Sequence, residues 1–492
     1  MQKYEHAFGK NDIRGIYGED ITEELYTATG KGLVKYLEKE SEKQPSDMWI
    51  TVCMDARTHS PSLCKALIAG IISTGANVID LGLAPTPIGY YSEAVGVPDE
   101  LTGGKGVISA CIITASHNPK EYNGLKMTYK KQTLNESQIK EVRDITFEIL
   151  SLPSNTASVP KGQIKQYNII PDYIKEMKEK FGNIGKGVKV VVDSANATGG
   201  IVGPELYREI GCEVVELFSE PDGTFPNHHP NPSVEKTLDT LKETVIKENA
   251  DIGIAYDGDS DRIGVVDNQG KYLTGDKLLL IYALDLIETC KEKGIIPKIV
   301  SEVKCSQVLY DTIDACGGQA IMCKTGHGYI KGKMKESGAI LAGEMSGHTF
   351  FKDRYYGFDD AIYAGCRIIE IIAKHKALKQ DFSIREMLEP FDKVFTSAEV
   401  RFPCPNELKK STLLEVQQIV ENNRDIFGSP IKDIITLDGM RIVFDGGFAL
   451  IRQSNTEPVF TLRFEAKTKE ECEKFQNCMT GLLQKILDKA KV

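Results

Sequence analysis

Ile-Gly-Ile-Ala-Tyr-Asp-Gly-Asp-Ser-Asp-Arg occupies residues 252–262 of the chain, and this stretch joins a short apolar run to an acidic loop. Similar apolar runs recur at residues 49–55, 77–83, 107–113, 188–193, 213–218, 298–303, 319–324 and 339–344. Segments with the pattern of helices, such as 60–74 and 276–291, lie between them. Short apolar strands that alternate with helices predict parallel βαβ units, each sheet being covered on both faces.

The last hundred residues follow another pattern. Residues 394–402, 434–437, 441–444 and 459–466 resemble antiparallel strands, Asp445-Gly446-Gly447 is typical of a turn, and 468–491 predicts a long charged helix. The sequence therefore predicts an α/β protein of three α/β domains followed by a C-terminal α+β domain. We place the domains at residues 1–158, 159–272, 273–392 and 393–492.

Composition narrows the class of function. The chain has 492 residues, of which 41% are hydrophobic, and 60 basic against 70 acidic residues give a net charge of −10. These values argue against general disorder and against a broad basic surface for nucleic acid or an anionic membrane. No apolar run approaches the roughly 20 residues of a membrane span. The polar first ten residues lack the features of a signal peptide, and the 12 cysteines form no CxxC pair. We therefore expect a cytoplasmic protein with a small-molecule substrate.

The first polar cluster, Thr114–Pro119, directly follows an apolar strand, and we refer to it as the serine loop. It places Ser116 between polar neighbours on a loop. A turn that caps a helix has the same composition. The chain has no GxSxG elbow, which disfavours an acyl-enzyme hydrolase. A serine that carries a phosphoryl group is the other interpretation, because phosphoserine offers strong acceptor oxygens to a metal ion.

The second cluster is the metal loop, Asp257–Arg262. Its carboxylates Asp257, Asp259 and Asp261 alternate in a glycine-containing loop, and an all-oxygen ligand set suits Mg²⁺. An EF-hand is disfavoured because Arg262 stands where that loop needs glycine and Asn268 stands where it needs glutamate. A solvated acidic turn and an aspartyl-phosphate nucleophile at Asp257 are the alternatives.

Two further clusters have the composition of ligand-binding loops or of ordinary turns. The sugar loop, Gly343–His348, contains Glu344 and Ser346, which could bind two neighbouring hydroxyl groups. The phosphate loop, Arg452–Pro458, combines a guanidinium with Ser, Asn and Thr donors. Ligands of open α/β sheets bind outside the carboxyl ends of strands, where several of these loops lie. Four single polar residues are placed similarly in the sequence, namely Arg14, Lys126, Lys304 and His327.

The four loops in this order resemble the α-D-phosphohexomutase superfamily, and most of all its bacterial phosphomannomutase/phosphoglucomutase members. The resemblance covers essentially the whole chain. It implies three mixed α/β/α-sandwich domains and a C-terminal α+β domain around a central cleft. It also implies an intramolecular phosphotransferase that interconverts hexose 6-phosphate and hexose 1-phosphate through a phosphoserine enzyme and a 1,6-bisphosphate.

The resemblance also implies residue roles. Ser116 would carry the phosphoryl group and complete the Mg²⁺ shell of Asp257, Asp259 and Asp261, while Arg262 would steady the transferring group. Lys126 and His327 match the proton-transfer positions, and the sequence leaves open which of them is acid or base in each half-reaction. The sugar would be bound by Glu344, Ser346 and His348. The phosphate that is not transferred would be bound by Arg452, Ser454, Asn455 and Thr456. The residues that would line the cleft are Arg14, Asn118 and Lys304.

The sequence says less about the substrate and the oligomeric state than about the reaction. Glucose or mannose 1,6-bisphosphate is the expected activator, and the protein is expected to be a monomer or homodimer. Asn11 stands where bacterial members often have Tyr, so the role of that position is open. Met345 fits the mannose/glucose group, whereas glucosamine-phosphate mutases more often have Gln there. A phosphoglucosamine mutase, a phosphoserine-dependent sugar phosphatase and an inactive binding paralogue are the alternatives.

Overall fold

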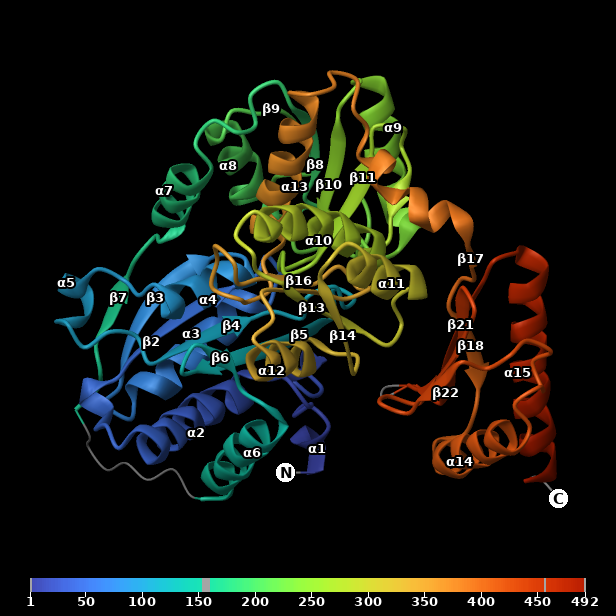
Figure 1. Cartoon of the computed structure of the whole chain (residues 1–492). Coiled ribbons are helices and arrows are strands. Elements are labelled where there is room, and N and C mark those ends of the chain that lie inside the picture. Colours follow the sequence, from blue (N-terminus) through green and yellow to red (C-terminus); the bar gives the residue numbers. More distant parts are fainter. Residues whose placement is uncertain (1, 153–159, 455–456, 491–492) are drawn as a thin grey trace. The chain divides into compact units, whose positions relative to one another are not determined.

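The computed structural model describes residues 2–152, 160–454 and 457–490 (Figure 1). The chain packs as two compact units. Unit 1 contains Met1–Leu273, Gly347–Thr349 and Phe358–Phe382, and unit 2 contains Thr274–Ser346, Phe350–Gly357 and Ser383–Val492. The predicted boundary between residues 158 and 159 lies outside the described residues, and the other boundaries remain predictions.

The first sheet of unit 1 is mixed. Its strands run in the order β1 (Ile13–Ile16), β5 (Tyr122–Tyr129), β4 (Ser109–Ile113), β2 (Trp49–Met54), β3 (Asn77–Leu83) and β7 (Ile164–Gln166), and β6 (Gln132–Thr133) pairs with β5. One hydrophobic core joins it to α2 (Glu23–Ser41), α3 (Ser60–Ile72) and α6 (Glu136–Ser151). The opposite face meets α4 (Thr86–Ala94), where Gly89 lies against Ile112 and Cys53. Burial on both faces explains the almost continuous apolar composition of β2 and β4.

The second sheet of unit 1 has the order β12 (Tyr272–Leu273), β11 (Ile263–Asp267), β10 (Ile252–Tyr256), β8 (Lys189–Asp193) and β9 (Glu213–Leu217). Helix α9 (Asp239–Lys247) packs on one face. Helices α7 (Ile170–Phe181), α8 (Gly203–Glu209) and α13 (Ala361–Lys376) also belong to this unit. Gly365 of α13 lies so close to the Tyr207 hydroxyl group that a Cβ atom would clash with it. Helix α13, which lies far along the chain, therefore packs with the helices that accompany the second sheet.

The structure confirms the mixed sheets that the family resemblance implies, and it corrects the parallel βαβ units predicted from the strand pattern at two places. Strands β4 and β5 are antiparallel, as are β10 and β11. The apolar pattern does not predict the strands that return from the two polar loops, Tyr122–Tyr129 and Ile263–Asp267, because a polar loop after a strand also has the composition of a helix start. The serine and metal loops are consequently connections between neighbouring antiparallel strands, and this fixes both of their ends.

Unit 2 holds a four-stranded sheet in the order β14 (Gln319–Cys323), β13 (Lys298–Glu302), β15 (Leu341–Gly343) and β16 (Thr349–Phe351). Helix α12 (His327–Ser337) shares one core with this sheet, and α10 (Gly275–Lys291) contacts β15, with Leu279 against Gly343. Helix α11 (Gln307–Ala315) contacts α10 and β14.

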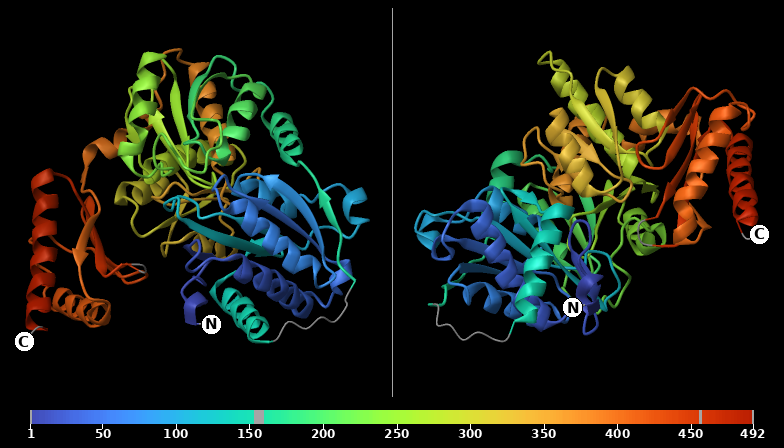
Figure 2. Two further views of the ribbon diagram at one scale, coloured as in Figure 1. Left: turned by 180° about the vertical axis from the view of Figure 1, so that it is seen from behind. Right: turned by 90° about the horizontal axis from the view of Figure 1, so that it is seen from below.

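The C-terminal sheet has the order β17 (Phe395–Thr396), β22 (Val459–Ala466), β21 (Gly447–Gln453), β20 (Met440–Phe444) and β19 (Asp433–Ile435), and β18 (Val400–Pro403) also pairs with β22. Helices α14 (Asn406–Asn422) and α15 (Lys469–Lys489) share one hydrophobic core with this sheet (Figure 2). Phe448 and Leu450 contribute instead to a small cluster with Val303 and the half-buried Met322. The C-terminal sheet thus contacts the segment that follows β13.

The single strand predicted over residues 394–402 is wrong, because the chain forms two strands there. Thr396 faces Glu465 and Val400 faces Leu462, so three residues lie opposite two on β22. The extra residue makes a bulge. Ser397 secures it, since its N–H donates to the Phe464 carbonyl and its Oγ accepts from the Phe464 N–H.

None of the helices in the described part of the chain is both long and apolar enough to cross a bilayer.

Candidate active site

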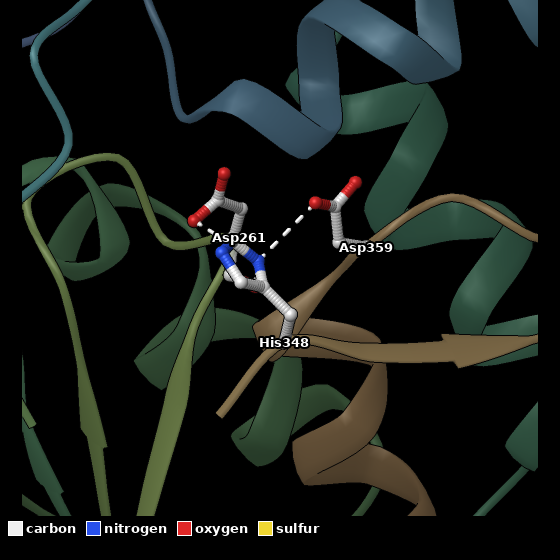
Figure 3. A group of neighbouring side chains, drawn as sticks. All are labelled: Asp261, His348 and Asp359. Carbon is white, nitrogen blue, oxygen red and sulfur yellow. Dashed lines mark hydrogen bonds and ion pairs between the residues drawn. The ribbon is translucent and has the colours of Figure 1, made fainter. Parts of the chain in front are cut away.

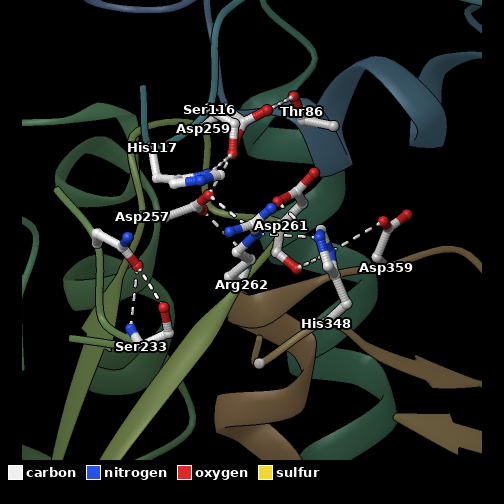
Figure 4. Close-up of polar contacts among 12 residues, drawn as sticks. Thr86, Ser116, His117, Ser233, Asp257, Asp259, Asp261, Arg262, His348 and Asp359 are labelled. Carbon is white, nitrogen blue, oxygen red and sulfur yellow. Dashed lines mark hydrogen bonds and ion pairs between the residues drawn. The ribbon is translucent and has the colours of Figure 1, made fainter. Parts of the chain in front are cut away.

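The serine loop and the metal loop meet in unit 1, at the ends of β4 and β10 (Figure 4). Ser116 is buried, and its Oγ donates to Asp257 Oδ2 at 2.6 Å and lies 3.2 Å from His117 Nδ1. The backbone of Ser116 is left-handed, with φ of +50°. Gly258 touches the Ser116 carbonyl so closely that any Cβ there would clash. A strained serine is therefore held directly against a carboxylate.

The electrostatics around Ser116 also fix the state of its histidine neighbour. Burial lowers the pKa of His117, and the charges of Arg262 and Arg14 lower it further. His117 is consequently neutral over the physiological pH range. A neutral ring can exchange a hydrogen bond with Ser116 Oγ without adding a second positive charge.

Asp257, Asp259 and Asp261 form a buried carboxylate trio with one oxygen of each within 4.8 Å of the others. Burial and the two neighbouring carboxylates raise the pKa of Asp257 well above its usual range. Buried oxygens Asp259 Oδ1 and Asp261 Oδ1 have no hydrogen-bond partner. Buried carboxylate oxygens that accept no hydrogen bond are costly unless a cation satisfies them, so the donor set fits a hard divalent ion such as Mg²⁺.

Lys126, on β5, supplies a fixed positive charge beside the trio. Its Nζ donates to Asp259 Oδ2 at 2.6 Å and contacts Asp261 Oδ2. Burial by itself lowers the pKa of Lys126, but Asp259 and Asp261 outweigh that effect and raise it well above its usual value. The ammonium group therefore stays protonated. Thr86 adds a neutral contact, since its Oγ1 also donates to Asp259 Oδ2, at 2.6 Å.

Arg262 points into a chain of polar side chains (Figure 4). Its Nε donates to His348 Nε2 at 3.0 Å and lies 3.8 Å from Asp257 Oδ2. His348 Nδ1 lies 3.2 Å from Asp359 Oδ2 and 3.2 Å from the Asp261 carbonyl oxygen (Figure 3). Because Nε2 must accept from arginine, the proton of a neutral His348 ring lies on Nδ1. The structure thus brings His348 to Arg262 and the metal loop.

Arg14 lies next to the serine loop and contacts Asn118 within it. Arg14 Nη1 donates to Asn118 Oδ1 at 3.1 Å, and Nη2 forms an ion pair with Asp12. Burial lowers the pKa of Arg14, but Asp12, Asp259 and Asp261 raise it overall. Asn11, the position whose role the sequence leaves open, is half-buried one residue before Asp12.

In unit 2, the carboxyl end of the β13–β15 sheet holds the other predicted residues. Glu344 is buried, and its Oε1 accepts from the Gly326 N–H at 2.7 Å, next to the half-buried His327 at the start of α12. Ser346 is half-buried. Lys304 Nζ lies 3.7 Å from Glu302 Oε1.

The phosphate loop begins at the end of β21. Arg452 is 8% exposed, and its Nε donates to Asp438 Oδ2 at 3.2 Å. The same Asp438 oxygen accepts from the Thr325 N–H at 3.1 Å. Ser454 is half-buried, and its Oγ accepts from the Glu457 N–H at 3.1 Å. Asn455 and Thr456 lie outside the described residues.

Sequence reasoning missed three buried polar residues around the serine and metal loops, namely Arg57, Thr86 and Asp359. Arg57 follows strand β2, so it lies just beyond the carboxyl end of a strand, where ligands of α/β sheets bind. The other loops were selected by this same placement, which could have selected Arg57 as well. Thr86 begins α4 with a proline on either side, and Asp359 belongs to an Asp-Asp pair before α13. Each of these signals is also common in residues that only stabilise turns or helix ends.

Four consecutive segments match the domains of one family. Residues 5–152, 171–270 and 274–391 match the phosphoglucomutase/phosphomannomutase alpha/beta/alpha domains I, II and III, and residues 399–480 match its C-terminal domain. The chain is 36% identical to a phosphomannomutase/phosphoglucomutase of Pseudomonas aeruginosa, over 97% of this chain and 96% of that protein. It is 35% identical to a phosphoglucomutase of Neisseria meningitidis, with the same coverage of both chains.

A solved structure agrees with these matches. The crystal structure of a phosphoglucomutase/phosphomannomutase family protein from Burkholderia thailandensis superposes with a TM-score of 0.84 at 32% identity, covering 97% of both chains. Three α/β domains and a C-terminal domain, the order of the loops and the extent of the similarity lead to one conclusion. The chain belongs to the phosphoglucomutase/phosphomannomutase family.

Proposed function

We propose that the protein is a phosphohexomutase that interconverts the 6-phosphates and 1-phosphates of mannose, glucose or both. The observation that carries this proposal is the 2.6 Å hydrogen bond from Ser116 Oγ to Asp257 within a buried carboxylate trio. The similarity to enzymes named phosphomannomutase/phosphoglucomutase and phosphoglucomutase supports the substrate class.

The reaction consists of two phosphoryl transfers. In the first, the bond between phosphorus and Ser116 Oγ breaks, Oγ takes up a proton, and a bond forms to O1 or O6 of the sugar phosphate, whose hydroxyl proton passes to a base. The product is the 1,6-bisphosphate. In the second, the bond between the other phosphoryl group and its sugar oxygen breaks, the sugar oxygen regains a proton, and Ser116 Oγ gives up its proton and bonds that phosphoryl group. Such transfers depend on positioning and on charge neutralisation.

Asp257, Asp259 and Asp261 would hold Mg²⁺ through one oxygen each, with Ser116 oxygen completing the protein's share of the shell. When bound, the ion neutralises charge on the phosphoryl oxygens. The Oδ1 atoms of Asp259 and Asp261, which accept no hydrogen bond, and the raised pKa of Asp257 support this assignment.

Three cations of the chain assist transfer. Lys126 stays protonated and places its charge at the metal loop, where it can donate to a phosphoryl oxygen or to the departing sugar oxygen. Arg262 is aimed by His348 and offers its terminal N–H groups to the phosphoryl group. Arg14 orients Asn118 at the edge of the serine loop. A protonated Lys126 suits an acid better than a base, which leaves His327 as the proposed base.

The loops of unit 2 would read the sugar and its other phosphate. Glu344 and Ser346 are assigned to the sugar hydroxyl groups. The remaining phosphate is assigned to the cations and donors around it, namely Lys304, Arg452, Ser454, Asn455 and Thr456. His348, which was expected beside the sugar, is assigned here through its contact with Arg262.

Glucose or mannose 1,6-bisphosphate is the proposed activator, since loss of the intermediate would leave Ser116 without its phosphoryl group. A cytoplasmic enzyme that works as a monomer or homodimer, without a nucleic-acid or membrane partner, fits the net charge of −10. Met345 favours mannose and glucose over glucosamine as substrates.

A coupled assay with mannose 1-phosphate, glucose 1-phosphate and glucosamine 1-phosphate side by side tests the proposal. With Mg²⁺ we expect 6-phosphate formation from mannose 1-phosphate or glucose 1-phosphate, increased by catalytic amounts of the 1,6-bisphosphate. Release of inorganic phosphate without bisphosphate activation would instead indicate a phosphatase. Turnover of glucosamine 1-phosphate alone would indicate a phosphoglucosamine mutase, and no turnover with Ser116 unmodified would indicate a binding paralogue.

A further inference from the structure

Arg57 is among the largest fully buried side chains of the described residues, and every N–H group of its guanidinium has a partner. Nε donates to Asp55 Oδ2 at 3.0 Å. Nη1 donates to the carbonyls of Pro119 and Tyr122 at 2.6 and 3.1 Å, and Nη2 donates to those of Ser116 and Asn118 at 2.8 and 2.7 Å. Arginine has five N–H donors, so all of the donors of Arg57 are used in these hydrogen bonds.

The four carbonyl groups all belong to the connection between β4 and β5 that contains the nucleophile. Only a planar guanidinium with a fixed fork of donors can bind four carbonyls of one loop at once. One of them is the carbonyl of Ser116 itself, whose left-handed φ of +50° is costly for a residue with a side chain, and another follows two residues later at Asn118. Arg57 therefore stabilises a backbone conformation that the serine would not adopt by itself.

Arg57 is itself held on its other sides. Asp55 Oδ1 accepts from the backbone N–H of Arg57 at 3.1 Å and from Ser60 Oγ at 2.6 Å. The ring of Phe225 lies 5.4 Å from the guanidinium carbon. Gly223 touches the Ala56 carbonyl so closely that a Cβ would clash. Neighbouring charge, aromatic ring and backbone leave the guanidinium no room to reach a ligand.

We propose that Arg57 is a positioning residue for the phosphoryl transfer, which sets the direction of Ser116 Oγ by binding the carbonyls of Ser116, Asn118, Pro119 and Tyr122. This inference rests on the proposed function, because it assigns Arg57 to the loop of the proposed nucleophile. Since the guanidinium donors of Arg57 are all bonded to Asp55 and to the loop carbonyls, we expect its loss to misplace Ser116 and to leave substrate binding in place. Misplacement of a reacting group by roughly 1 Å can cost about 100-fold in rate.

Arg57→Lys is the test variant, because lysine keeps the charge beside Asp55 but has three donors and no fork. Arg367→Lys is the matched control, since Arg367 is also a buried arginine of unit 1 but lies on α13, where it bonds Tyr363 and Glu370. We expect Arg57→Lys to lower kcat about 100-fold with KM within about twofold of wild type. We expect Arg367→Lys to retain wild-type kcat.

Hydrogen exchange on both variants supplies a readout that does not depend on turnover. The amides of Ser116, Asn118 and Tyr122 are bonded within the loop, and we expect them to exchange faster in Arg57→Lys while the amides of β2 and β4 do not. Wild-type kcat in Arg57→Lys, an equal loss in Arg367→Lys, or unchanged exchange in the loop would each overturn the inference. So would an Arg57→Lys protein that fails to fold, because Arg57 would then be required by the domain as a whole.

The wild-type protein separates this inference from the proposed function. A wild-type enzyme without mutase activity refutes the function, whereas an active wild type with an equally active Arg57→Lys refutes only the positioning role. Faster loop exchange in Arg57→Lys would still show that Arg57 orders residues 116–122, whatever reaction the loop performs.

Discussion

In the serine and metal loops of unit 1, the side chains proposed to react contact one another directly, whereas the proposed substrate-reading side chains of unit 2 contact mainly the surrounding backbone and supporting residues. Ser116 meets Asp257, and Lys126 meets Asp259, inside a buried cluster. In unit 2, Ser346 and Ser454 are half-buried. Glu344 bonds a backbone N–H group.

Buried arginines support the loops of both units. Arg441 Nη1 donates to the carbonyls of Val303 and Cys305, on either side of Lys304, and the guanidinium lies 3.6 Å from the Phe448 ring centre. Arg463 Nη1 donates to the Lys304 carbonyl. As with Arg57, these arginines bind the backbone of the loop, so the side chain of Lys304 is left available to bind a ligand.

This difference between the units indicates which charged groups must be oriented before the phosphoryl group is transferred. Phosphoryl transfer requires charges that are oriented before the reaction, because their reorganisation would add to the barrier. Recognition of a sugar phosphate in two orientations requires donors that stay available to either one. We therefore expect variants of the serine and metal loops to change kcat, and variants of the sugar and phosphate loops to change KM.

Asp261→Asn should give the largest effect. It removes one charged ligand of the trio and one partner of Lys126, so we expect kcat to fall by about 10³-fold and the Mg²⁺ requirement to rise. Steady-state rates over a Mg²⁺ titration measure both changes. The control is Asp144→Asn, since Asp144 is exposed on α6. Unchanged Mg²⁺ dependence would remove the trio from the proposed metal site.

Lys126→Met should lower kcat by about 10²–10³-fold, because the fixed charge beside Asp259 and Asp261 is lost where negative charge develops. KM should change little. Lys140→Met, on the exposed face of α6, loses the same charge without loss of rate. A variant with wild-type kcat and raised KM would break the contrast between the units, since Lys126 would then read substrate.

Arg452→Gln tests the other half of the contrast. Loss of a charged hydrogen bond to phosphate costs about 1.5–3 kcal/mol, so we expect KM for the hexose phosphate to rise about 10- to 150-fold with kcat nearly unchanged. Arg424→Gln, on the exposed surface of the same unit, is the control. If kcat fell and KM held, Arg452 would belong to the reacting group instead.

The pH dependence of stability gives the smallest effect. Burial lowers the pKa of His228, but its hydrogen bond to Asp193 and the charge of that residue raise it overall. The raised folded-state pKa means that this contribution is complete below the unfolded pKa of about 6.5 and is lost as pH rises through the folded value. Between pH 6 and 8.5, the Tm of wild type should fall about 1–2 °C more than that of His228→Gln. Parallel Tm curves would show that the pair contributes nothing.

The sequence predicts the strands well where an apolar run or a regular apolar–polar alternation marks their whole length. Asn77–Leu83, Ile252–Tyr256 and Val459–Ala466 have the predicted bounds in the structure. Strands β5 and β11 are harder to predict from the sequence, since each follows a polar loop that also has the composition of a helix start. The bulge at Ser397 depends on its pairing with β22, which local composition does not encode.

The site could be predicted in its motifs more than in its contacts. The serine and metal loops meet because their strands end near one another, as the position rule for α/β sheets expects. The position of Arg57 after a strand marks it as a candidate, but its partners are backbone carbonyl groups, which every residue has, so the sequence does not show what it binds. The contact between His348 and Arg262 joins segments 86 residues apart, and only the folded chain brings them together.

The central claim is that Ser116 carries the phosphoryl group, and direct labelling tests it. The dephosphorylated protein is incubated with Mg²⁺ and glucose 1,6-bisphosphate labelled in its phosphoryl groups, and the labelled residue is identified by peptide mass. The account predicts about one phosphoryl group per chain, on Ser116, that passes on to unlabelled glucose 6-phosphate or mannose 6-phosphate and is absent from Ser116→Ala. Label on Asp257, label that reaches only water, or labelling and mutase turnover retained by Ser116→Ala would contradict it.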